Sequence, residues 1–272
     1  MNRNLNSMGL VLALAAISAA AVQPASSGAL DGWLKSQYGA QANVAHAWKG
    51  TDWKNPQADS GPASATEQRV CLDSTPQPKA PRFVAVCTTV KDAGPPTPGL
   101  VDLWQIDAAN SQPALFKREV PAGWGAGAPG KVSVVQVGPD RFAFRVESGA
   151  TNMGSNVGVS ELYLAQNGTL ASWFAYPHIS DYNGAFESND PSKCRSDAEC
   201  GKKFGYSTTC ELHVDRTKQT DGYYALSIRV QGIDRGRPIH RSIPVPLVDG
   251  KPSLTPAELK KLECSRNSSW DQ

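Results

Sequence analysis

The chain has 272 residues, of which 40% are hydrophobic and 19% are charged, and its 27 Lys and Arg nearly balance its 25 Asp and Glu. The net charge of +2 supplies no basic field for nucleic acid, and the apolar fraction is too high for a disordered chain. We therefore expect a folded protein of one large domain or two small ones, with no nucleic-acid partner.

The first 21 residues have the pattern of a signal peptide. Arg3 supplies a positive charge, residues 8–17 form a short apolar run, and three alanines follow at positions 19–21. The run is too short to span a bilayer, which needs about 20 apolar residues. Because no later apolar stretch reaches 18 residues, the sequence predicts no transmembrane segment. We expect an exported protein that is periplasmic or secreted.

The six cysteines are expected to form disulfides, because an exported protein folds in an oxidising compartment. None of them belongs to the CxxC pattern that is typical of zinc and redox sites. Proximity in the sequence favours pairing Cys71 with Cys87, Cys194 with Cys200 and Cys210 with Cys264. A rival pairing joins Cys194 to Cys210 and Cys200 to Cys264, and the sequence alone leaves both open.

Residues 22–80 are expected to hold one short helix and a long loop. Proline, serine, glycine, aspartate and glutamine dominate residues 50–80, which is typical of a loop. A helix is predicted over residues 31–38, because four large apolar side chains there share one helical face. These side chains are Leu30, Trp33, Leu34 and Tyr38. We expect a β-rich domain over residues 81–272.

Short strands are predicted along most of the remaining chain. They cover residues 82–90, 101–107, 131–137, 141–147, 211–215, 223–231 and 237–245. Asn167 and Gly168 separate two further strand-like runs, and this dipeptide favours a type I′ hairpin. Pro238 and Pro244 mark the last strand as an edge strand, because proline cannot donate a ladder hydrogen bond.

Two stretches of the sequence echo each other. Three similar segments follow one another in the same order in each stretch: RFVAVCTTV, VDLWQID and ALFKREV in the first, and RFAFRVESG, SELYLAQ and TLASWFA in the second. This repetition predicts a mainly β fold, an antiparallel β-sandwich or meander, with propeller-like blades as the alternative. Thr255, Pro256 and Glu258 form a capping box, which predicts a short C-terminal helix that runs to about Cys264.

The familiar catalytic motifs fail in this sequence. Residues 125–131 have the spacing of a phosphate-binding loop, but Val132 stands where a serine or threonine would hold magnesium. The sequence around Ser160 resembles a nucleophile elbow but lacks the second glycine of that motif. The four histidines are too far apart to form a zinc motif. The sequence therefore identifies no catalytic residue, and we expect no cofactor.

Three polar groupings remain as weaker candidates. Glu147 and Glu161 would form a carboxylate pair if they faced each other from neighbouring strands, with His178 as an additional candidate. His213 and Asp215 share one strand face, which the alternation favours as solvated. Residues 181–190 crowd oxygen ligands together and are the alternative site for calcium, although we expect no metal.

The strongest candidate for function is the segment over residues 177–210, which we expect to be a loop stiffened by three of the cysteines. Structureless loops of this length are usually functional or disordered, and the cysteines favour order. Aromatic and cationic side chains on a rigid loop are typical of interface anchors. The candidate partner-binding residues are Tyr182, Phe186, Lys202, Lys203, Phe204 and Tyr206.

These observations favour an exported, disulfide-bonded, non-enzymatic binding protein with a protein partner. A sharper version is a periplasmic inhibitor or immunity-type protein that acts on an envelope-targeting hydrolase. The alternative is a secreted hydrolase whose carboxylate and histidine residues assemble only in the fold.

Overall fold

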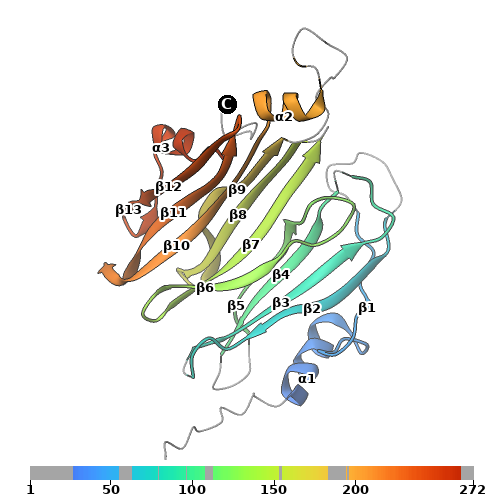
Figure 1. Cartoon of the computed structure of the whole chain (residues 1–272). Coiled ribbons are helices and arrows are strands. Elements are labelled where there is room, and N and C mark those ends of the chain that lie inside the picture. Colours follow the sequence, from blue (N-terminus) through green and yellow to red (C-terminus); the bar gives the residue numbers. More distant parts are fainter. Residues whose placement is uncertain are drawn as a thin grey trace, which may run out of the picture.

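A computed structural model describes residues 27–54, 63–78, 80–95, 97–107, 113–152, 155–182, 194 and 196–264. The predicted signal segment lies outside these ranges, as does Phe186. Two antiparallel sheets dominate the described residues, with short helices packed around them (Figure 1). The mainly β prediction is therefore confirmed.

The first sheet contains five strands in chain order, each antiparallel to the next. These strands are β1 (Trp48–Lys49), β2 (Thr66–Ser74), β3 (Arg82–Val90), β4 (Gly99–Ile106) and β5 (Pro113–Ala122). The expectation of a continuous loop over residues 50–80 is wrong, because β2 lies inside it. A bulge between Val70 and Leu72 shifts the register there, so the alternation of side chains that would reveal the strand is broken.

The second sheet contains seven antiparallel strands, with β6 and β12 at its edges. They are β6 (Val132–Gly138), β7 (Arg141–Asn152), β8 (Ser155–Gln166), β9 (Thr169–Tyr182), β10 (Tyr206–Thr220), β11 (Tyr223–Asp234) and β12 (Arg237–Val245). The hairpin at Asn167 and Gly168 is confirmed, with φ angles of 48° and 77°. The edge position of β12 is confirmed as well. A small ladder of β13 (Leu247–Val248) and β14 (Lys251–Pro252) follows.

The two sheets share one apolar core between them. Phe83 and Leu103 enter this core from the first sheet, and Phe142, Phe144 and Tyr163 enter it from the second. The Phe83 ring lies 6.1 Å from the Phe142 ring and 5.0 Å from the Phe144 ring. The echo in the sequence corresponds to three consecutive strands in each sheet, β3–β5 and β7–β9. The structure is thus consistent with the predicted sandwich of meandering sheets.

Helices cover the outer faces of the sandwich (Figure 1). On the first sheet, α1 (Ser27–Tyr38) packs Leu30 and Leu34 against Val84 and Trp104. On the second sheet, the residues that flank α3 (Pro256–Lys261) complete another core, which includes Leu262 and Cys264. The capping box between Thr255 and Glu258 is confirmed, and the helix ends at Lys261 rather than near Cys264.

Three disulfides join the cysteines in the pairing that sequence proximity favours. Cys71 bonds Cys87, Cys194 bonds Cys200 and Cys210 bonds Cys264, with Cα–Cα separations of 5.7, 5.3 and 6.2 Å. This set fits an oxidising environment outside the cytoplasm. Within the described ranges, no helix has the length and apolar character that crossing a membrane requires.

Candidate partner-binding surface

The expected loop over residues 177–210 is partly wrong, because strands occupy both of its ends. β9 runs to Tyr182, β10 begins at Tyr206, and the two strands pair there. The sequence favours a loop here because Ser180 and Thr208 are polar, but both side chains are buried in the strands. The Thr208 hydroxyl donates to the Ser180 carbonyl oxygen at 3.1 Å, so the hydroxyl is satisfied inside the sheet. The described part of the connection between these strands carries one short helix, α2 (Asp197–Phe204).

Three local features define α2. The Ser196 hydroxyl accepts a hydrogen bond from the Glu199 backbone N–H at 3.2 Å and caps the first turn. The disulfide between Cys194 and Cys200 ties that turn to the preceding chain. At the other end, the Gly205 N–H donates to the Gly201 carbonyl oxygen at 2.9 Å. A Cβ at Gly205 would collide with that same oxygen, so glycine is needed where the helix ends.

The predicted interface residues separate into two groups. Lys202, Lys203 and Phe204 lie at the C-terminal end of α2 and are exposed. The Phe204 ring is 41% exposed, and the Lys203 Nζ lies 5.3 Å from its centroid. By contrast, the Tyr182 and Tyr206 rings stack on each other at 6.0 Å, and Tyr206 is buried. The two tyrosines thus pack on each other at the paired ends of β9 and β10, and the buried Tyr206 ring is not displayed with the first group.

The C-terminal end of α2 lies against the turn between β11 and β12. The Arg235 N–H donates to the Gly205 carbonyl oxygen at 2.9 Å. A Cβ on Gly236 would be 3.5 Å from the Lys202 carbonyl oxygen, which places the turn beside the last helical turn. Arg235 and Arg237 are both exposed. We call the group formed by Lys202, Lys203, Phe204, Arg235 and Arg237 the α2–turn surface; α2 lies at one end of the second sheet (Figure 1).

The two arginines of this surface were not among the predicted site residues. Arg235 and Gly236 have φ angles of 47° and 74°, which form the tight turn that presents both arginines. A dipeptide that accepts positive φ is a recognisable hairpin signal. The proximity of this turn to α2, however, depends on the pairing of β10 with β11, which aligns Tyr206 with Asp234.

The predicted carboxylate pair does not form. Glu147 lies opposite Ser160, whereas Glu161 lies opposite Val146. Because successive residues of a strand point to opposite faces, the two glutamates lie on different faces of the sheet. A register different by one residue would have placed them together, and the sequence does not specify that register. The hydrolase alternative therefore loses its pair of carboxylates.

His178 does gather other polar groups around it. Its ring meets the exposed ring of Trp124 edge to face at 5.9 Å. Burial lowers the pKa of His178, and Arg145 acts in the same direction. Glu147 and a hydrogen bond to the Val159 backbone partly oppose this shift in the pKa.

This grouping lacks the contacts of a catalytic site. Among the described residues, neither the Ser160 hydroxyl nor the His178 Nδ1 finds a hydrogen-bond partner. The hydrogen bond through which a general base activates a nucleophile is therefore not formed. Ser160 is also only 1% exposed, so a substrate does not reach its hydroxyl.

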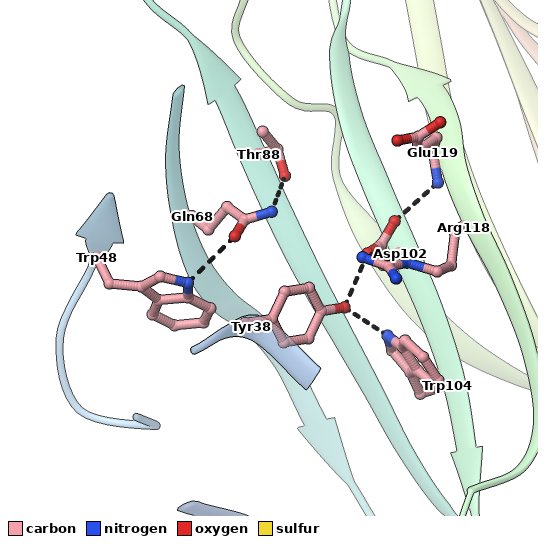
Figure 2. Close-up of polar contacts among 8 residues, drawn as sticks. All are labelled: Tyr38, Trp48, Gln68, Thr88, Asp102, Trp104, Arg118 and Glu119. Atoms are coloured by element: carbon pink, nitrogen blue, oxygen red, sulfur yellow. Dashed lines mark hydrogen bonds and ion pairs between the residues drawn. The ribbon is translucent and has the colours of Figure 1, made fainter. Parts of the chain in front are cut away.

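A second polar network surrounds the buried carboxylate of Asp102, which is 4% exposed (Figure 2). Asp102 accepts hydrogen bonds from the Tyr38 hydroxyl at 2.8 Å, the Arg118 Nε at 3.0 Å and the Glu119 N–H at 2.7 Å. The Trp104 Nε1 donates to the Tyr38 hydroxyl at 2.6 Å. Burial and then the Asp102 charge raise the pKa of Tyr38. Because these contacts join α1 to β4 and β5, the network fastens the helix to the sheet.

The remaining polar candidates are solvated or incomplete. His213 lies 3.0 Å from Arg229, on the face of β10 opposite Leu212 and Val214, and Asp215 bonds Thr217 and Lys218. Asp181 accepts from the Ser207 hydroxyl at 3.2 Å, but residues 183–190 of the candidate calcium site lie outside the described residues. Within the part of the chain that the structure describes, no three histidine, cysteine, aspartate or glutamate residues cluster as a metal site.

Comparisons with protein-family models, curated proteins and solved structures gave no match to this chain.

Proposed function

We propose that the protein is exported and binds a protein partner through the α2–turn surface. The observation that carries the proposal is the exposed Phe204 ring at the end of a short, fixed helix, with Lys203 beside the ring and a turn that carries Arg235 and Arg237 against the end of the helix. Aromatic and arginine side chains are enriched among the residues that dominate binding energy in interfaces. A single such anchor surrounded by long polar side chains is typical of a recognition surface.

The rigidity of this surface supports the same proposal. The disulfide between Cys194 and Cys200 holds the start of α2, and the hydrogen bond from Arg235 to Gly205 holds its end. Binding to a pre-ordered surface avoids most of the entropy cost of ordering a loop. Two residues after Phe204, the Tyr206 ring stacks on the Tyr182 ring, and this contact holds the start of β10 against the end of β9.

A finer version of the proposal is a periplasmic inhibitor or immunity-type protein whose partner is an envelope-targeting hydrolase. Inhibitors of hydrolases commonly bind with little change in backbone conformation. A scaffold with two packed sheets and three disulfides suits that mode of binding. The predicted signal segment is consistent with the same compartment.

The experiment is affinity capture from an envelope extract, followed by identification of the bound protein and titration with that protein in pure form. The test variant carries Phe204→Ala and Arg237→Ala. The matched control carries Phe116→Ala and Arg216→Ala, which change an exposed phenylalanine on β5 and an exposed arginine near the end of β10 that is farther from α2. We expect the wild type and the control to capture the same protein and the test variant to bind it at least tenfold more weakly. Equal capture by all three proteins, or none by the wild type, would refute the proposal.

A further inference from the structure

We infer that the partner presents an acidic face with an apolar recess for Phe204, an inference that rests on the proposed function. The α2–turn surface carries Lys202, Lys203, Arg235 and Arg237. Three carboxylates lie close to these cations in the chain. Asp234 pairs with Arg235 at 3.7 Å, whereas Asp197 begins α2 and Glu199 lies one helical turn before Lys202 and Lys203, so four cations stand against three carboxylates. The surface thus has an excess of positive charge.

This excess is local rather than a property of the whole protein. The complete chain has a net charge of only +2, so a group of four cations at one end of the second sheet is not explained by general basicity. Lys202 and Arg237 make no ion pair with any described residue, which leaves both charges available to a partner. Exposed charges of this kind accelerate association with an oppositely charged surface and exclude cationic ones.

The apolar area that the α2–turn surface offers to a partner is small. Phe204 supplies one ring, of which the Lys203 ammonium covers part at 5.3 Å. Ile233 is also exposed on β11, two residues before the turn. Two apolar side chains fit a recess in a protein, but they offer too little apolar area for stable anchoring in a bilayer. A protein segment with carboxylates around an apolar recess is therefore the partner that this surface fits.

The first test uses two synthetic twelve-residue peptides that share a central pair of leucines. One peptide carries glutamate and aspartate at its other positions, and its counterpart carries lysine. Binding is measured by fluorescence anisotropy at low and at high salt. We expect the acidic peptide to bind at least tenfold more tightly than the basic one, and added salt to weaken that binding, because exposed charges are screened.

Charge reversal then locates the site. The variant with Lys202→Glu and Arg237→Glu is expected to lose at least tenfold in affinity for the acidic peptide. The matched control carries Arg216→Glu and Lys218→Glu on β10, where both side chains are exposed, and is expected to bind as the wild type does. Circular dichroism of both variants shows whether each is folded, so a loss of binding is not mistaken for unfolding.

The inference fails if both peptides bind equally, or if the reversal at Lys202 and Arg237 leaves binding unchanged. It also fails if the protein binds vesicles of phosphatidylglycerol and phosphatidylcholine but neither peptide, which would assign the surface to a membrane. If Phe204→Ala with Arg237→Ala still abolishes capture from the envelope extract, the proposed function survives that failure. If the protein neither prefers the acidic peptide nor captures a protein in a way that depends on Phe204 and Arg237, both proposals fail.

Discussion

His178 is a partly buried histidine whose neighbours come from β7, from β8 and from the segment after β5. Burial under the Trp124 ring disfavours the charged imidazolium, and the nearby Arg145 disfavours it further. Glu147, which pairs with Arg145 at 3.4 Å, and the Val159 backbone favour the charged form but do not outweigh burial. The pKa of His178 is therefore lower in the folded protein than in the unfolded chain.

We expect the free energy of unfolding to decrease less steeply at acid pH in the His178→Gln variant than in the wild type. The unfolded chain binds a proton at the ordinary histidine pKa of about 6.5, above the folded value, so acid favours unfolding below that pH. The contribution of neutral His178 to the stability of the folded protein is therefore fully present above pH 6.5 and decreases as the pH falls. Urea unfolding from pH 8 to pH 5 measures this slope. The exposed His240→Gln is the control, and an unchanged slope in His178→Gln would contradict the expectation.

Asp102→Asn is expected to lower the free energy of unfolding by about 3 kcal/mol, because the buried carboxylate accepts three hydrogen bonds and faces Arg118. The matched control is Glu67→Gln, which breaks a half-exposed ion pair with Lys91 at 3.0 Å. That change should cost about 1 kcal/mol or less. Chemical denaturation compares the two, and losses of similar size would show that the Asp102 network does not fasten α1.

At the scale of elements, α3 shows how a very short helix is held. It has six residues, fewer than an isolated helix needs in water. The capping box satisfies its first turn, and Leu259 and Leu262 pack against the core of the second sheet. The disulfide from Cys264 to Cys210 then joins the end of this segment to β10.

Replacement of Cys210 and Cys264 by alanine is expected to cost more stability than replacement of Cys194 and Cys200. The first bond closes a segment of 54 residues and the second a segment of 6. Loop-closure entropy assigns them about 4 and about 2 kcal/mol. Guanidinium unfolding of the two double variants measures the difference. A larger loss in the second variant would mean that α2, and not α3, depends more on its bond.

Some elements could be predicted from the sequence because a local rule determines them. The hairpin at Asn167 and Gly168 needs two residues that accept positive φ, and the capping box at Thr255 lies within four residues. β2 could not be predicted in this way, because its bulge breaks the alternation of side chains. The ends of β9 and β10 could not either, because their buried hydroxyl side chains have the sequence pattern of a solvated loop.

The residues of the candidate site also differ in whether the local sequence alone identifies them. Lys202 and Phe204 could be identified because they lie in one charged, aromatic segment between cysteines. Arg235 and Arg237 could not, because only the register of β10 against β11 brings their turn beside α2. A single sequence gives no measure of strand register when both faces of a strand carry mixed residues.

The whole molecule is joined by the core between its sheets, so the two sheets should unfold together. Phe144 is fully buried there and contacts Phe83 of the opposite sheet. Phe144→Ala is expected to cost about 4 kcal/mol. Far-ultraviolet circular dichroism and tryptophan fluorescence should still report one shared transition. Two separate transitions would show that each sheet folds by itself, and the exposed Phe116→Ala should cost much less.

The central claim is that a protein partner binds the α2–turn surface in the compartment to which the chain is exported. Photocrosslinking in intact cells tests it most directly, with Lys202 replaced by p-benzoylphenylalanine and with Lys218 replaced in the same way as the control. We predict one specific protein adduct from position 202 and none from position 218. No adduct at position 202, or the same adduct at both positions, would contradict the account.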